Sequence, residues 1–245
     1  MLRNIWIVAR RELGAFFAQP IAYIVIIMVL LVTGYIFAGQ LALASQPGAD
    51  VRPTVVAILS SFAFLMLFAS PAITMRLLSE EQKSGTMELL MTLPVRDGEV
   101  VLGKFLAAFL LYLILLLLTA VYPLVLLRFG NPDPGPLIGA YLGVILWGAA
   151  LLAIGTMTSA STENQIVAFF LSFGISLILL LSGLAATLFA SNPSLNTIFM
   201  ELSFNDHLNA FLAGLVNAKD VLYYALIAAV SLFAAARMLE SRRWR

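Results

Sequence analysis

The stretch FLAAFLLYLILLLLTAVYPLVLL, Phe105 to Leu127, contains no charged side chain. As a helix it is long enough to cross a bilayer, which takes about 20 apolar residues. Five more uncharged runs occur along the chain: Pro20–Gly39, Val55–Met75, Leu137–Met157, Ile166–Ala190 and Val221–Ala236. Six spans predict an all-α polytopic membrane protein. The last run is the shortest, and Lys219 and Arg237 would have to extend toward the membrane surface at its ends.

The composition agrees with lipid as the solvent of this chain. It is 62% hydrophobic and only 11% charged, whereas soluble domains are about 25% charged. A larger core cannot explain the excess, because single cores stop growing near this chain length. The net charge of +1 gives no field that would favour nucleic acid. Cysteine is absent and His207 is the only histidine, so we expect no disulfide, no metal site and no cofactor.

The basic residues predict the orientation of the spans. With six spans, all Lys and Arg residues except Arg52, Arg128 and Lys219 fall on one side. Basic residues accumulate on the cytoplasmic side, so we expect both termini there, in a bacterial or archaeal cytoplasmic (inner) membrane. A cleaved signal peptide is the alternative for the N-terminus. The uncharged run from Leu13 to Ala49 is far longer than a signal core of about 7–15 residues.

Residues 76–104, between the second and third spans, form a charged cytoplasmic loop that ends in a near match to a nucleotide-binding loop. Gly98, Gly103 and Lys104 fit the pattern G-x-x-x-x-G-K-[ST], but Phe105 stands where a magnesium-binding hydroxyl is needed. We therefore expect no ATP binding here. Asp97 is expected to cap the third span, and Lys104 to hold it at the membrane interface.

The middle of this loop predicts two short helices. Ser79 and Gln82 have the spacing of a capping box, and Ser84-Gly85 breaks the first helix. Thr86 can begin a second helix, which ends before Pro94. Its apolar face is Met87, Leu90 and Met91, with Leu89 and Leu93 beside it. Such a short helix is unstable alone and suits docking into a groove of another protein. The alternative is a helix that rests on its own bundle or on lipid.

Two further segments have amphipathic patterns. Residues 1–18 predict a helix in the membrane interface, with one face made of Leu2, Trp6, Ala9, Leu13 and Phe16. An ordinary flank of the first span is the alternative. Residues 191–220, on the outer side, predict two short helices, the second capped by Asn205 or Asp206. Their apolar positions are Leu195, Ile198, Phe199 and Leu202, and then Leu208, Phe211, Leu212 and Leu215.

The spans lack the ionisable residues that ion-driven transporters usually keep inside the membrane, so energy is expected to arrive through the cytoplasmic loop. Glycines in the fourth and fifth spans indicate close helix packing: Gly139, Gly143, Gly148, Gly155, Gly174 and Gly183. An intramembrane serine protease is a rival of another class, with Ser176 as nucleophile and His207 as base. Half of a G-x-S-x-G motif, Gly174-Ile175-Ser176, is its only support.

The segment LLSEEQKSGTMELLMTLPVRDGEVVLGKF, Leu77 to Phe105, resembles the cytoplasmic loop of permease subunits of ATP-binding-cassette (ABC) transporters of the type-2, exporter-type class. The shared core reads S-E-E-x-x-S-G-T-x-E-L-L. Within that class, the segments FAQPIAYIV and HLNAFLAGLVNAKDVLYY resemble the gliding-motility-type subfamily.

The resemblance implies one transmembrane permease domain, residues 1–245, that is not itself an enzyme. The loop would be a coupling helix in a cleft of a separate ABC-type ATPase subunit, and a second permease copy, identical or paralogous, would complete an exporter in the lipid bilayer. A non-transporting membrane scaffold stays an alternative, and the substrate is open. The residues to which the resemblance assigns coupling are Glu80, Glu81, Gly85, Thr86, Met87, Glu88, Leu89, Leu90, Met91 and Pro94.

Overall fold

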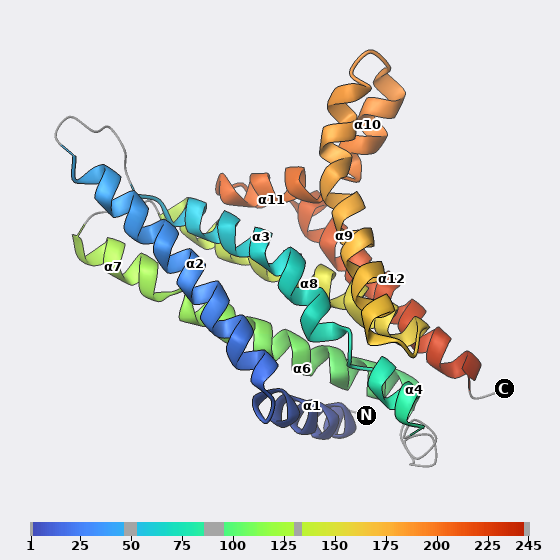
Figure 1. Cartoon of the computed structure of the whole chain (residues 1–245). Coiled ribbons are helices and arrows are strands. Elements are labelled where there is room, and N and C mark those ends of the chain that lie inside the picture. Colours follow the sequence, from blue (N-terminus) through green and yellow to red (C-terminus); the bar gives the residue numbers. More distant parts are fainter. Residues whose placement is uncertain (1, 47–52, 86–95, 130–133, 243–245) are drawn as a thin grey trace.

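The computed structural model of the chain describes residues 2–46, 53–85, 96–129 and 134–242. Within these ranges every regular element is a helix (Figure 1). In chain order the helices are α1 (Leu2–Phe17), α2 (Pro20–Ala44), α3 (Val55–Thr74), α4 (Ser79–Ser84), α6 (Asp97–Leu118), α7 (Val121–Phe129), α8 (Pro134–Ser161), α9 (Gln165–Leu188), α10 (Pro193–Glu201), α11 (Phe204–Leu212) and α12 (Ala218–Arg242).

Six helical segments are long and apolar enough to cross a membrane, which confirms the prediction from the uncharged runs. These segments are Ala22–Ala44, Val55–Ser84, Asp97–Arg128, Gly135–Ser161, Gln165–Leu188 and Ala218–Ser241. The protein is therefore an all-helical, multi-pass membrane protein.

Two of the spans differ from the uncharged runs that predict them. The sixth is not short, because α12 continues through Asp220 at one end and Arg237 at the other and has 25 residues. The third is not one continuous helix, because α6 ends at Leu118 and α7 begins at Val121. Pro123 explains this break, since its ring lacks an N–H and would clash with the carbonyl of a preceding helical turn.

Helix α8 lies at the centre of the bundle and packs against α3, α6, α9, α11 and α12. Its Trp147 is fully buried against Phe204 of α11 and Tyr224 of α12, with ring centroids 4.8 and 6.3 Å away. On another side, a Cβ atom at Gly148 would lie only 2.1 Å from the ring of Tyr112 on α6. The expected close packing at glycine is therefore confirmed here.

The other glycines of the fourth and fifth spans, α8 and α9, are not all closely packed. At Gly139, Gly143, Gly155 and Gly183 a Cβ atom would come within 3.0 Å of a neighbouring helix or of the segment that leads into one, so close packing is confirmed there as well. At Gly174 an added Cβ meets nothing within 4 Å, and the expectation of close packing is wrong at that position.

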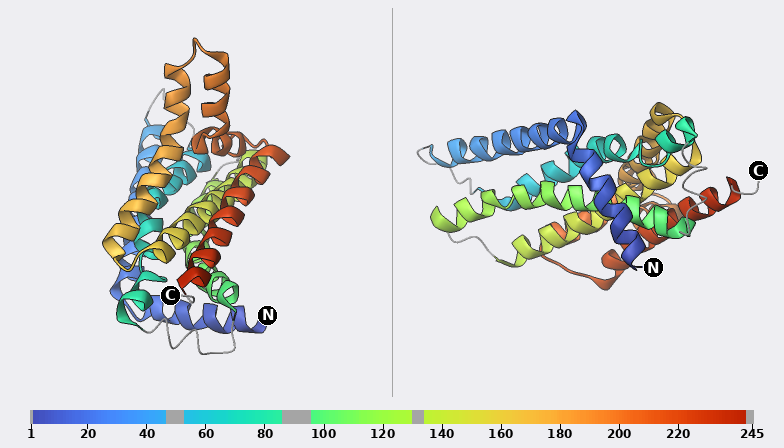
Figure 2. Two further views of the ribbon diagram at one scale, coloured as in Figure 1. Left: turned by 90° about the vertical axis from the view of Figure 1, so that its right-hand side faces the viewer. Right: turned by 90° about the horizontal axis from the view of Figure 1, so that it is seen from below.

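The two ends of the bundle carry different elements (Figure 2). Helix α1 lies across one end, roughly perpendicular to the spans, and α4 and the last turns of α12 lie at the same end. Helices α10 and α11 lie at the opposite end, where α10 and the last turns of α9 project beyond the other helices. The helix predicted before the first span and the two predicted between the fifth and sixth spans are therefore present as separate short elements, which we call the N-terminal helix and the outer helices.

The outer helices follow their apolar patterns unequally. In α11, Leu208, Phe211 and Leu212 are buried as the pattern predicts, but Leu215 lies beyond the helix and is 60% exposed. The cap is not Asn205 or Asp206: the hydroxyl of Ser203 accepts a hydrogen bond from the N–H of Asp206. Helix α10 buries no residue. It contacts α9 through Phe199, whose ring stacks on Phe189 with centroids 5.4 Å apart.

Candidate functional site

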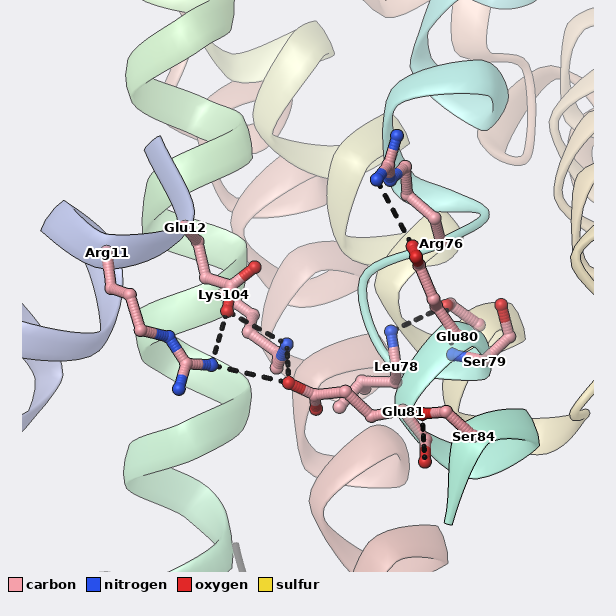
Figure 3. Close-up of polar contacts among 10 residues, drawn as sticks. Arg11, Glu12, Arg76, Leu78, Ser79, Glu80, Glu81, Ser84 and Lys104 are labelled. Carbon is pink, nitrogen blue, oxygen red and sulfur yellow. Dashed lines mark hydrogen bonds and ion pairs between the residues drawn. The ribbon is translucent and has the colours of Figure 1, made fainter. Parts of the chain in front are cut away.

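The candidate site lies at the end of the bundle where α1, α4 and α6 meet (Figure 3). The chain enters residues 86–95 from α4 and returns through Arg96 into α6. Of the expected coupling residues, Glu80, Glu81 and Gly85 belong to this site. The others, Thr86, Met87, Glu88, Leu89, Leu90, Met91 and Pro94, lie outside the described residues.

Helix α4 is fixed to the bundle by one hydroxyl group of α8. The Oγ atom of Ser159 accepts hydrogen bonds from the main-chain N–H groups of Leu78 and Ser79, at 3.0 and 3.1 Å. It also donates a hydrogen bond to the carbonyl of Met75 at 3.0 Å. Free N–H and C=O groups at helix ends need such partners when they are buried. Ser159 therefore joins the end of α3 and the start of α4 to the central helix.

The expected capping box of α4 is wrong. Ser79 is the first residue of the helix rather than its cap, and its hydroxyl donates to the carbonyl of Met75. Gln82 instead extends to α8, where its amide donates to the carbonyl of Ala160 at 3.0 Å. The predicted break at Gly85 is confirmed: it ends α4 with a φ of 70°, a conformation that favours glycine because it has no Cβ atom.

The start of α6 also differs from its prediction by one residue. Arg96 is the cap and Asp97 is the first helical residue. The carboxylate of Glu99 accepts hydrogen bonds from the N–H of Arg96 at 3.2 Å and from the side-chain amide of Asn4 on α1 at 3.1 Å. This carboxylate therefore stabilises the first turn of α6 and joins it to α1.

Lys104 is not an interface residue, contrary to the expectation from the sequence. Its side chain is 1% exposed, and its ammonium group lies 2.9 Å from Glu81 of α4 and 3.3 Å from Glu12 of α1. Arg11 lies beside the same two carboxylates, 2.6 Å from Glu12 and 3.3 Å from Glu81. We call these four residues, Arg11, Glu12, Glu81 and Lys104, the charge cluster. It connects α1, α4 and α6.

Charge compensation keeps Glu12 ionised. Burial alone would raise its pKa, but Lys104 and the hydrogen bond from Arg11 outweigh burial and hold the pKa of this carboxyl below its usual range. The pKa of Arg11 is raised in turn, chiefly by its hydrogen bond to Glu12. A buried ion pair contributes little over an apolar contact, but the loss of one partner is costly. The cluster therefore favours one arrangement of the three helices.

A polar cavity of about 260 Å³ opens beside the charge cluster. Its lining includes Lys104 and also Glu80, which is half exposed and pairs with Arg76 at 3.2 Å. Such exposed pairs are worth less than about 1 kcal/mol. Glu80 is thus more exposed than Glu81, whose side chain is 16% exposed and contacts Lys104.

The sequence did not predict that the four residues of the charge cluster come together. Glu12 is the only acidic residue of α1, and Lys104 lies about two helical turns into α6, where the helix has become apolar. A charge placed within an apolar helix face indicates a buried partner. That signal was present, but the partner of Lys104 could not be chosen without the helix arrangement.

The rival protease site is not assembled. His207 has both ring nitrogens engaged: Nδ1 lies 2.5 Å from the carboxylate of Asp220 and Nε2 lies 3.2 Å from the carbonyl of Glu201. Ser176 is fully buried in α9, and its hydroxyl has no hydrogen-bond partner in the described part of the chain. A nucleophile and its base must share a hydrogen bond or come close to it. Among the described residues no three His, Cys, Asp or Glu side chains gather as metal ligands.

The arrangement is that of a multi-pass helical membrane protein in which α4 is held against the bundle directly before residues 86–95. Residues 40–237, more than three quarters of the chain, match the family described as "ABC-2 family transporter protein". The chain belongs to this family. Its six apolar segments supply the membrane part that such a transporter requires.

One curated relative comes from Pseudomonas aeruginosa and is described as "Probable ABC transporter permease protein NosY". It is 35% identical over 104 residues, which is 42% of this chain and 38% of the relative. The matched region therefore spans well under half of that protein's length.

Proposed function

We propose that the protein is the transmembrane subunit of an ABC exporter and that it couples ATP hydrolysis by a separate ATPase subunit to substrate movement. The observation that carries this proposal is the construction of α4. Ser159 and the charge cluster hold this short helix on the spans α3, α6 and α8, and Gly85 directs the chain from it into the expected coupling segment. A displacement of that segment by the ATPase would thus be transmitted to α3, α6 and α8.

The same geometry is compatible with two kinds of function. The spans can move a substrate, or their motion can act on a partner protein in the membrane. The motifs FAQPIAYIV and HLNAFLAGLVNAKDVLYY favour the gliding-motility-type subfamily, and a second permease copy would complete the transporter. ATP chemistry belongs to the ATPase partner, because Phe105 occupies the position of a magnesium-binding hydroxyl.

The partner and the absence of intrinsic ATP turnover can be tested together. We expect the tagged chain, purified gently from its native membrane, to carry an ABC-type ATPase and vanadate-sensitive ATP hydrolysis. After the ATPase is removed with high salt, the chain alone should hydrolyse no ATP. Hydrolysis by the stripped chain, or purification without any ATPase, would contradict the proposed function.

The orientation is proposed from the basic residues, with both termini and α4 on the cytoplasmic side of the inner membrane. The chain has no cysteine, so single cysteines report cleanly. A cysteine at Ser45 or Ser194 should react with an impermeant maleimide added to intact cells, and a cysteine at Ser84 should react only after lysis. All three positions are exposed in the structure. Labelling of the Ser84 position from outside would reverse the topology.

A further inference from the structure

The face of α1 that points away from α6 carries both cationic and large apolar side chains. Arg3, Trp6, Ile7, Arg10 and Gly14 are exposed and follow the 3–4 spacing of one helix face. The opposite face is turned inward, with Ala9 and Phe16 buried. Its Val8 meets α6 so closely that a Cβ atom at Gly103 would lie 2.7 Å from it. This orientation corrects the predicted apolar face, since Leu2 is 84% and Trp6 is 54% exposed.

The charges of α1 are separated between these faces. Its one acidic residue, Glu12, points inward to Lys104, so the outward face carries only positive charge. Arg3 and Arg10 form no ion pair with a described residue, and Arg11 remains 57% exposed while it contacts Glu12. No acidic side chain on this face, among the described residues of α1, would repel an anion.

A shallow hollow of about 440 Å³ lies between the guanidinium groups and the apolar side chains of this face. Its lining is Trp6, Ile7, Arg10, Arg11 and Gly14. Gly14 leaves the hollow open at its own position, since an added Cβ there meets nothing within 4 Å. The hollow therefore offers cationic donors on one side and an indole and an aliphatic chain on the other.

The position of this surface relative to the membrane follows from the short connection between α1 and α2. Helix α2 begins at Pro20, directly after α1 ends at Phe17, so α1 lies at the level where the first span enters the membrane. Figure 2 shows α1 crossing the end of the bundle rather than continuing α2. A helix with tryptophan and arginine on one face at this level is placed at the boundary of headgroups and acyl chains.

We propose that this face of α1 binds the phosphate of an anionic phospholipid of the inner leaflet, such as phosphatidylglycerol. Arginine forms paired, charge-assisted hydrogen bonds with phosphate, and Arg3 and Arg10 are the donors on this face that form no ion pair with a described residue. Trp6 and Ile7 contact the upper acyl chains. The lipid holds α1 on the membrane surface, and through Glu12 it steadies the position of Lys104 and Glu81. The proposal rests on the membrane placement of α1 and does not depend on the ATPase.

Fluorescence of Trp6 can test the lipid preference directly. In a Trp147→Phe/Trp244→Phe background, Trp6 is the remaining tryptophan. The chain is reconstituted in phosphatidylcholine vesicles that contain phosphatidylglycerol, with one lipid or the other brominated on its acyl chains. At equal mole fraction, brominated phosphatidylglycerol is expected to quench Trp6 several-fold more effectively than brominated phosphatidylcholine.

The arginines determine this selectivity if the proposal is right. One basic residue near an anionic surface is worth about fivefold in binding. Arg3→Gln/Arg10→Gln should therefore remove most of this several-fold preference for phosphatidylglycerol. Arg128→Gln, an exposed arginine at the other end of the bundle, should leave it unchanged.

Three results would overturn the proposal. Equal quenching by the two lipids would show that the face has no headgroup preference. Protection of Trp6 from both brominated lipids would show that protein covers the face. A preference that persists unchanged in Arg3→Gln/Arg10→Gln would show that these arginines do not bind the lipid phosphate. None of these results bears on whether an ATPase co-purifies with the chain.

Discussion

Lys104→Met is expected to destabilise the protein by about 3 kcal/mol and to detach α1 and α4 from α6. The variant leaves the carboxylates of Glu12 and Glu81 side by side without the ammonium group that now lies 3.3 Å from Glu12 and 2.9 Å from Glu81. Removing one partner of a buried ion pair typically costs about 3–5 kcal/mol. The lower value applies because both carboxylates remain 16% exposed and Arg11 stays beside them.

The measurement is thermal unfolding of the purified chain in detergent. For a chain of this size, about 3 kcal/mol corresponds to a Tm lower by roughly 6–12 °C. Lys219→Met is the matched control, because Lys219 pairs with Glu201 in an exposed position and such pairs contribute less than about 1 kcal/mol. Equal Tm values for the two variants would contradict the burial of the Lys104 charge.

A neutral replacement of the cluster separates charge from packing. In Glu12→Gln/Glu81→Gln/Lys104→Met the one charge of the cluster that remains is Arg11, which is 57% exposed, and buried ion pairs replaced as a unit often cost nothing. This triple variant should regain most of the lost stability. If it also loses ATP-dependent transport when an ATPase is bound, the cluster transmits motion between α4 and α1. If transport is kept, the cluster serves only to position the helices.

The spans could be predicted because the bilayer imposes a length and a polarity on every helix that crosses it. Their ends could not be predicted in the same way. Charged residues such as Asp220 and Arg237 continue the helix beyond the apolar run, because helix formation does not require lipid contact. The caps at Asp97 and Ser79 were each wrong by one residue, and helix boundaries of this kind depend on partners such as Ser159 on another helix.

The charge cluster shows a different limit. The pairing of Lys104 with residues 12 and 81 depends on how α1 crosses α6, and that crossing is set by Val8 against Gly103. Local spacing gives no information on contacts between elements so far apart in sequence. The coupling face itself, by contrast, rests wholly on local spacing and stays a prediction, because its residues lie outside the described ranges.

A single charged substitution can test whether the expected residues bind the ATPase. Leu90→Asp places a carboxylate on the predicted apolar face of Met87, Leu90 and Met91. If that face docks in an apolar groove, the unpaired carboxylate costs several kcal/mol, and about 1.4 kcal/mol is already tenfold in affinity. The amount of ATPase that co-purifies with the chain should therefore fall by about 100-fold or more.

The fold should survive this change, because α4 is held by Ser159 and the charge cluster, ahead of the substitution in the chain, and the spans are not altered. Membrane yield and Tm should thus stay near those of the native chain. Thr92→Ala, which the helical spacing places off the apolar face, is the control in the same segment. If Leu90→Asp keeps its ATPase and its ATP hydrolysis as fully as Thr92→Ala does, the segment does not dock through this face. The attachment would then have to be sought at the exposed rim around Glu80.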